Sequence, residues 1–93
     1  MKVIYKYPLV IDANQHLILP VGSVILSVQE QFGELVLWAI IDIGMAIKER
    51  RLISVYGTGF NMEDNAMNES WHIQTVCMKN GLVWHVFERD NYE

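Results

Sequence analysis

Three histidines and one cysteine are the side chains of this chain most able to do chemistry. His16, His72 and His85 lack the i, i+2 or i, i+4 spacing that gives one element two metal ligands. Cys77 lies within an apolar-rich run, where a thiol usually serves as packing. The paired carboxylates are Glu63-Asp64, Glu88 and those of the acidic tail. We expect them in solvated settings without the apolar neighbours that raise the pKa of a catalytic acid. We therefore expect no metal site, no cofactor and no enzyme.

Two apolar-rich runs between residues 70 and 88 flank Asn80-Gly81, the dipeptide most typical of a two-residue hairpin turn. Such a turn places Cys77 opposite Trp84. One face of the hairpin is then apolar, and we expect it to be core. The other mixes polar with aromatic groups, and we expect it to be a working surface. The predicted core face holds Trp71, Ile73, Cys77, Leu82, Trp84 and Val86, and the mixed face holds His72, Gln74, Val76, Met78, Val83, His85 and Phe87.

A glycine-rich turn and a basic cluster are candidate anion sites. Gly57-Thr58-Gly59 could present backbone N–H groups to a phosphate, or form only a tight turn or bulge. It lacks the other residues of a P-loop. Arg50 or Arg51 could clamp a phosphate or carboxylate, or belong to a solvated face balanced by Glu49. His72 and His85 either hydrogen-bond to a ligand or are ordinary half-exposed histidines.

The aromatic side chains exceed what one small core needs if Trp38 and Trp84 fill its centre. We expect those two tryptophans to be buried. Tyr56, Phe60 and Trp71 flank a long polar loop over residues 60–70, and we expect them to be partly exposed. Exposed aromatic rings can stack a nucleobase or anchor a protein. The predicted ligand site therefore consists of Arg50, Arg51, Tyr56, Gly57, Thr58, Gly59, Phe60, Trp71, His72 and His85.

These candidates need a scaffold, and the pattern of the chain predicts a mostly β one. Six or seven short antiparallel strands should form a small sandwich or barrel-like domain over residues 1–93. Leu35–Ile41 is apolar on both faces, which indicates a central strand. Gln31-Phe32-Gly33 is typical of a three-residue hairpin loop. Residues 45–50 fit one helical turn, a bulge or a loop. The expected strands cover residues 2–8, 16–20, 23–29, 35–41 and 51–56 and the two arms of the last hairpin.

Composition narrows the classes of partner. The net charge of −4 argues against a general nucleic-acid binder, which needs clustered Lys and Arg. The apolar runs are too short to span a bilayer. A chain of 93 residues that is 52% hydrophobic is expected to hide part of its surface in a homo-oligomer. One cysteine fits a cytosolic setting as the default.

Short motifs along nearly the whole chain resemble a family of small, functionally uncharacterised domains encoded in bacteriophage and prophage genomes. Many relatives have a histidine after Tyr-Gly-Thr-Gly, where this chain has Phe60. The resemblance carries over no site residues, but it implies a binding protein of the host cytoplasm, of a kind that often counters host defence. The motifs are Tyr5-Lys-Tyr-Pro-Leu9, Ile18-Leu-Pro20, Ile25-Leu-Ser-Val28, Leu37-Trp-Ala39, Tyr56-Gly-Thr-Gly59 and His85-Val-Phe-Glu88.

Two functions follow from that resemblance. In the first, the chain is an oligomeric sponge that sequesters a small nucleotide-derived host immune signal in pockets lined by aromatic, glycine and arginine residues. In the second, it inhibits a host defence protein, such as a CRISPR effector, by presenting its acidic loop and tail to a basic channel. The basic cluster beside the glycine turn favours the first function, and the net negative charge favours the second.

Overall fold

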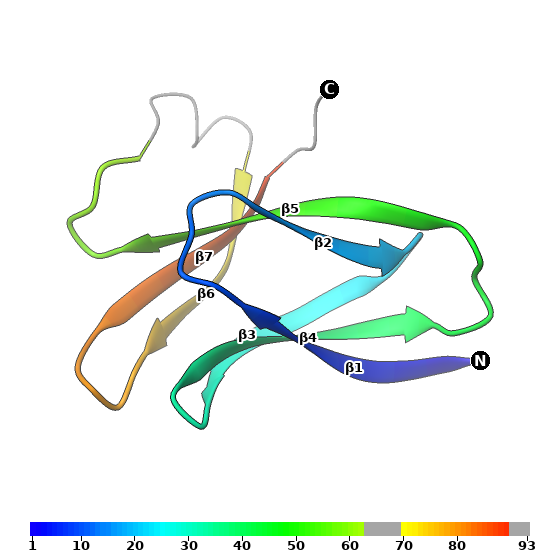
Figure 1. Cartoon of the computed structure of the whole chain (residues 1–93), viewed down its shortest axis with the longest axis horizontal. Coiled ribbons are helices and arrows are strands. Elements are labelled where there is room, and N and C mark those ends of the chain that lie inside the picture. The colour runs from blue at the N-terminus through cyan, green and yellow to red at the C-terminus, as the bar shows by residue number, and fades with distance from the viewer. Residues whose placement is uncertain (63–69, 90–93) are drawn as a thin grey trace.

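The structure, a computed structural model, describes residues 1–62 and 70–89. Seven strands in this part of the chain form two antiparallel sheets, with strand orders β1-β4-β3 and β2-β5-β7-β6 (Figure 1). The predicted β-sandwich is confirmed, and it is not a closed barrel. The acidic tail (90–93) and most of the predicted loop (63–69) lie outside the described residues. The strands are β1 (Lys2–Leu9), β2 (Gln15–Pro20), β3 (Val24–Gln31), β4 (Glu34–Asp42), β5 (Lys48–Gly57), β6 (Ser70–Cys77) and β7 (Val83–Arg89).

The core lies between the two sheets. Leu35, Leu37 and Ala39 project from the central strand β4 and are at most 1% exposed. Ile53 and Val86 of the other sheet are completely buried in the same cluster. Alternation along each strand sends every second side chain into this layer, which explains the period of two in the sequence.

The two tryptophans expected at the centre of the core are not there. Trp38 lies between two core residues of β4, so alternation turns it to the outer face of its sheet. There it is half-buried, with Lys6 Nζ 6.0 Å from its ring centroid. Trp84 is also half-buried and packs against the edge of the core. Aliphatic side chains fill the centre instead.

Of the three alternatives for residues 45–50, the structure has a loop that leads directly into a strand. The backbone N–H of Met45 donates to the carbonyl of Asp42 and closes a turn, and β5 begins at Lys48. Glu49 lies opposite Leu19 of β2. Pairing with β2 therefore extends the strand through the whole basic cluster and decides against a helix.

The β3–β4 connection is one residue shorter than predicted. Gln31 pairs with Glu34, so Phe32 and Gly33 alone form the turn, at φ 54° and 84°. Two positive φ values match the right-handed twist of the flanking strands. Phe32 occupies this strained position and is 94% exposed.

The β6–β7 hairpin has a different register from the predicted one. Cys77 pairs with Val83, so residues 78–82 form a five-residue connection rather than a two-residue turn. The N–H of Met78 donates to the carbonyl of Leu82 at 2.8 Å and closes the loop. The shift of one residue exposes Cys77, which we expected in the core, and buries Val76 and Met78.

A second irregularity in β6 changes its faces again. The pairing with β7 slips between His72 and Gln74, which is a β-bulge. On the N-terminal side of the bulge Trp71 is 51% exposed, although we expected it on the core face. On the hairpin side of the bulge, the five-residue connection places Thr75, not Val76, opposite His85. The bulge thus decides which β6 side chains reach the surface beside β7.

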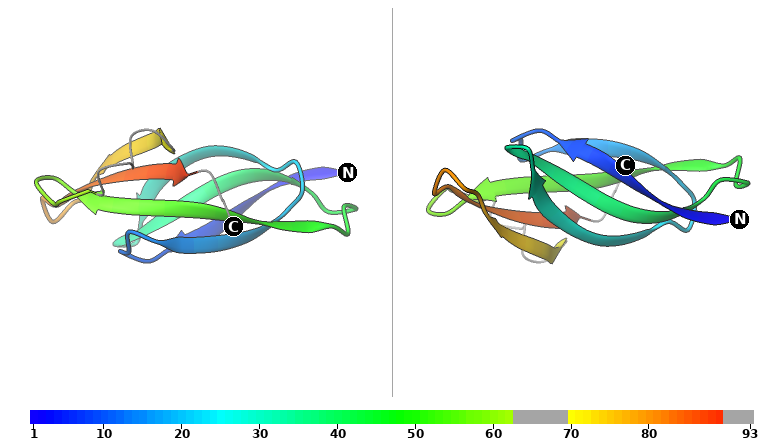
Figure 2. Two further views of the ribbon diagram at one scale, coloured as in Figure 1. Left: turned by 90° about the horizontal axis from the view of Figure 1, so that it is seen from above. Right: turned by 90° about the horizontal axis from the view of Figure 1, so that it is seen from below.

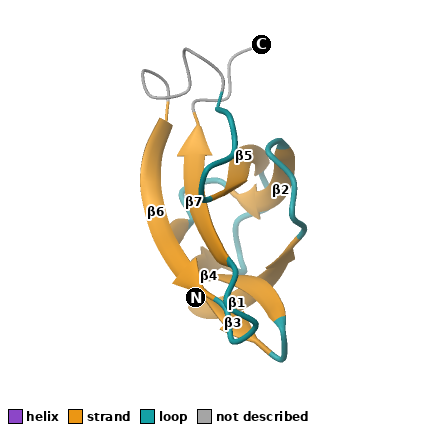
Figure 3. Ribbon diagram, turned by 90° about the vertical axis from the view of Figure 1, so that its left-hand side faces the viewer, coloured by secondary structure: helices purple, strands orange, loops and turns teal. Residues whose placement is uncertain are grey.

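The turns after β3, β5 and β6 lie toward the end of the molecule opposite the N terminus (Figures 1 and 2). The N–H of Lys79 donates to Glu30 Oε1 at 2.8 Å and ties the β6–β7 connection to β3 of the other sheet. Figure 3 views this end and shows β6 and β7 side by side. No helix within the described residues is long and apolar enough to cross a membrane.

Candidate functional site

Four side chains form a continuous hydrogen-bonded chain on the four-stranded sheet. Thr58 Oγ1 lies 2.7 Å from His85 Nε2. The other ring nitrogen, His85 Nδ1, lies 3.1 Å from Thr75 Oγ1. The same hydroxyl oxygen lies 2.9 Å from His72 Nε2. The chain crosses three elements, the turn after β5, then β7, then β6, on the outer face of the sheet, which points away from the three-stranded sheet.

Hydroxyl and imidazole groups can both donate and accept hydrogen bonds. Such a chain can hold a proton at any of several atoms and can bind a ligand that offers either a donor or an acceptor. It contains no carboxylate or thiol, and within the described residues no three His, Cys, Asp or Glu side chains group as metal ligands.

A pocket of about 290 Å³ begins where this chain ends. The rings of Phe60 and Trp84 meet edge to face, with centroids 6.2 Å apart. A Cβ atom on Gly57 would lie 3.1 Å from the Trp84 ring and 3.2 Å from the Phe60 ring, so glycine permits this packing. The volume lies just below the range usual for ligand pockets. This aromatic pocket is lined by Gly57, Thr58, Phe60, Gly81, Leu82, Val83 and Trp84.

The glycine-rich turn uses two of its own backbone donors. The N–H of Thr58 donates to the carbonyl of Val83 at 3.4 Å, and that of Phe60 donates to Gly57 at 3.0 Å. Gly59 adopts φ 86°, which favours glycine. This geometry is that of a tight turn that shapes the pocket wall.

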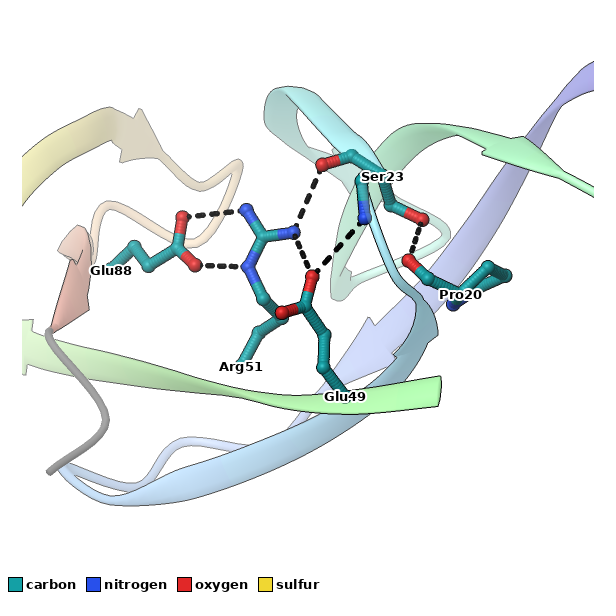
Figure 4. Close-up of polar contacts among 6 residues, drawn as sticks. Pro20, Ser23, Glu49, Arg51 and Glu88 are labelled. Carbon is teal, nitrogen blue, oxygen red and sulfur yellow. Dashed lines mark hydrogen bonds and ion pairs between the residues drawn. The ribbon is translucent and has the colours of Figure 1, made fainter. Parts of the chain in front are cut away.

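Arg51 lies between the sheets and is bound by a glutamate of the chain itself (Figure 4). Its Nε donates to Glu88 Oε2 in a short contact, and its Nη2 donates to Glu88 Oε1 at 3.0 Å. Its Nη1 donates to the carbonyl of Ser23 at 2.9 Å and lies 3.6 Å from Glu49. The hydrogen bonds that Glu88 accepts from Arg51 raise the pKa of Arg51 above its ordinary value. The guanidinium is therefore already engaged with a carboxylate.

A separate groove of about 430 Å³ lies between the edge strands β3 and β6. Trp71 and His72 line it, together with Arg51 and Glu88. Arg50 lies on β5 opposite Ile18 of β2. The structure thus brings seven predicted residues to the outer face or its adjoining pocket, and places Trp71 and Arg51 at the groove instead. Six of them are Tyr56, Gly57, Thr58, Phe60, His72 and His85, and the seventh, Gly59, lies in the turn between two residues of the pocket wall.

Tyr56 shares the outer face but is only 6% exposed, although we expected it to be partly exposed. Its ring meets Phe87 edge to face at 6.2 Å. Its hydroxyl has no hydrogen-bond partner within the part of the chain that the structure describes, and the same holds for the buried hydroxyl of Ser54. A ligand can therefore reach Tyr56 only indirectly.

The substitution Tyr56→Phe should leave the free energy of unfolding unchanged or raise it by about 1 kcal/mol, because it removes a buried hydroxyl without a partner and keeps the ring. Urea unfolding measures the effect. Tyr56→Ala is the contrasting variant and should be clearly destabilising, since it deletes a buried ring. A large loss in Tyr56→Phe would show that the hydroxyl has a partner after all.

Thr75 and Trp84 are functional candidates that the sequence reasoning missed. Thr75 was overlooked because the predicted register placed Val76 opposite His85. Trp84 was assigned to the core, yet it forms a wall of the aromatic pocket. The number of residues between Trp84 and the glycine-rich turn does not predict that they touch, because their contact depends on the pairing of β5 with β7.

Comparison with known proteins places the chain in a family. The family described as Domain of unknown function (DUF7352) matches residues 1–93. The chain belongs to the DUF7352 family. No protein with a curated description and no solved structure matches it. Membership in the DUF7352 family assigns no ligand, so the geometry of the site carries the functional argument.

Proposed function

We propose that the chain is a non-catalytic binding protein that holds a nucleotide-derived ligand by its base in the aromatic pocket. The observation that carries this proposal is the junction of the pocket with the hydrogen-bonded chain. Phe60 is 67% exposed beside Trp84, and Thr58, whose hydroxyl contacts His85, is part of the pocket lining. An exposed ring next to a polar group is the arrangement that stacks and orients a nucleobase.

The electrostatics favour recognition through the base over recognition through the phosphate. Arg51 is bound by Glu88 and lies at the other groove, and the chain carries a net charge of −4. Two N–H groups of the glycine-rich turn are also engaged within the chain. Ring stacking and the Thr58 hydroxyl therefore supply most of the affinity, with phosphates left near solvent.

The resemblance to phage-encoded domains suggests what the bound ligand is for. A protein of this kind, made in the host cytoplasm, would sequester a nucleotide-derived immune signal and withhold it from the host effector. A pocket of about 290 Å³ holds one base. A dinucleotide signal would therefore engage two copies of the chain, in agreement with the homo-oligomer expected from composition.

A second candidate is the stoichiometric inhibition of a host defence protein. The observation that favours it is Phe32, which is 94% exposed at the tip of the β3–β4 hairpin with φ 54°. Strained, exposed aromatic residues are typical of sites where a partner is anchored. Loss of effector inhibition in Phe32→Ala, with nucleotide binding retained, would favour this function over sequestration.

The substitution Phe60→Ala should weaken nucleotide binding about 5- to 150-fold, which corresponds to the 1–3 kcal/mol typical of stacking one base on one aromatic ring. Calorimetric titration with cyclic dinucleotides and with adenosine and guanosine monophosphates measures the loss. Phe32→Ala is the matched control, because it removes an exposed phenylalanine from another turn. Gly57→Ala should weaken binding as well, since its Cβ would crowd Trp84 and Phe60. Equal affinities in the wild type, Phe60→Ala and Gly57→Ala would exclude the pocket.

A further inference from the structure

The hydroxyl of Thr75 lies in the middle of the hydrogen-bonded chain. It has one proton to donate and faces two histidine ring nitrogens. Thr75 Oγ1 lies between His85 Nδ1, at 3.1 Å, and His72 Nε2, at 2.9 Å. A hydroxyl oxygen can accept two hydrogen bonds but donates only one. The two ring nitrogens facing it cannot both be bare acceptors. One of the two histidines must therefore present an N–H to Thr75.

The other end of the chain decides which arrangement is used. A ligand acceptor beside Thr58 requires the Thr58 hydroxyl to donate outward, so His85 must donate to it from Nε2. A neutral His85 then has no proton on Nδ1, and this nitrogen accepts the hydrogen bond that the Thr75 hydroxyl donates. His72 is left to donate from its own Nε2.

A ligand donor permits a second arrangement, because Thr58 is no longer required to donate outward. Thr58 can then accept from the ligand and donate to His85 Nε2, while His85 Nδ1 donates to Thr75. The Thr75 hydroxyl can then donate its hydrogen bond to His72 Nε2. His72 is in that case free to carry its own proton on Nδ1. The two ligand types therefore place different demands on a histidine that does not line the aromatic pocket.

We propose that a hydrogen-bond acceptor bound beside Thr58 in the aromatic pocket fixes His72 as the Nε2–H tautomer through the single proton of Thr75. The proposal rests on the proposed function, since it takes the aromatic pocket as the ligand site. His72 also lines the groove between β3 and β6. Occupation of the pocket therefore changes which nitrogen of His72 can donate at the groove. Because linkage is reciprocal, a group bound to His72 would also select between donor and acceptor ligands at Thr58.

Long-range proton–nitrogen NMR spectra of the two imidazoles test this proposal in mildly alkaline buffer, where imidazole side chains are ordinarily neutral. Quinoline, a flat acceptor, and indole, a flat donor of similar size, serve as probes. With quinoline, both histidines should be the Nε2–H tautomer. With indole, His85 is no longer held as the Nε2–H tautomer, and its Nδ1–H tautomer should appear. The indole N–H signal of Trp84 reports whether either probe enters the pocket.

Two variants separate the relay from mere proximity. In Thr75→Val, His72 should no longer respond to quinoline while His85 still does. In Thr75→Ser the response of His72 should return. A bound quinoline that leaves His72 as the Nδ1–H tautomer would overturn the proposal.

The ligand-free protein gives an independent test. The combination of His85 as Nε2–H with His72 as Nδ1–H should be absent, because both nitrogens facing Thr75 would then be bare. If this combination is present in the wild type, the coupling through Thr75 is overturned. If it is absent from the wild type and appears in Thr75→Val, the coupling is supported. If neither probe moves the Trp84 signal, the proposed ligand site fails, while the ligand-free spectra still decide the coupling.

Discussion

The substitution Arg51→Met is expected to lower the free energy of unfolding by about 3–5 kcal/mol, because it leaves the carboxylate of Glu88 buried without its counter-charge. The Glu88 side chain is only 8% exposed, and that of Arg51 is 18% exposed. A domain of this size has about 5–15 kcal/mol of stability in total. Urea unfolding followed by tryptophan fluorescence should therefore show a large shift of the midpoint.

The double substitution Arg51→Met with Glu88→Leu separates the pair from its burial. Replacement of both partners by apolar residues of similar size is often neutral, so the double variant should recover most of the loss. Lys48→Met is the matched control, since it changes an exposed cation on the same strand and should alter stability by less than about 0.5 kcal/mol. A double variant as unstable as Arg51→Met would show that packing, not the uncompensated charge, accounts for the effect.

The substitution Trp84→Ala is expected to cost about 2–3 kcal/mol and to abolish nucleotide binding. Trp84 is half-buried, so its loss should fall at or below the low end of the range for large-to-small changes. The same ring forms one wall of the aromatic pocket. Thermal unfolding measures the first effect, and calorimetric titration with cyclic dinucleotides measures the second.

Trp38→Ala provides the comparison, because it removes a half-buried tryptophan from the outer face of the other sheet. This variant should lose stability but retain binding. Trp84→Phe should keep most of the stability, since a ring still packs against Phe60. Full binding by folded Trp84→Ala would move the ligand site away from the pocket.

The candidate site could be predicted where it depends on neighbours in the sequence. Tyr56 to Phe60 are consecutive, and His72 and His85 were assigned to one face of one hairpin, where both contact Thr75. The role of Thr75 could not be predicted, because it depends on a five-residue connection and a bulge. A slip of one residue in register exchanges the two faces of a strand.

Arg51 shows the limit more sharply. Its type and position suggested an anion clamp, and the anion that it binds is Glu88, 37 residues further along the chain. The pairing of β5 with β7 brings the two strands together, and no local pattern contains that pairing. The same holds for Trp84 beside Gly57, a contact that a Cβ atom on the glycine would crowd.

The sequence by itself determined the strands, because alternation of apolar and polar residues is a local consequence of the pleated backbone. It also determined the all-β class of the fold, which the two antiparallel sheets confirm. Only the tertiary structure decided which side chains became partners and which tryptophans were left half-exposed. The physical reason is that strand register and sheet order are set by long-range packing and hydrogen bonding. An error of one residue in the register of a strand moves each of its side chains to the opposite face.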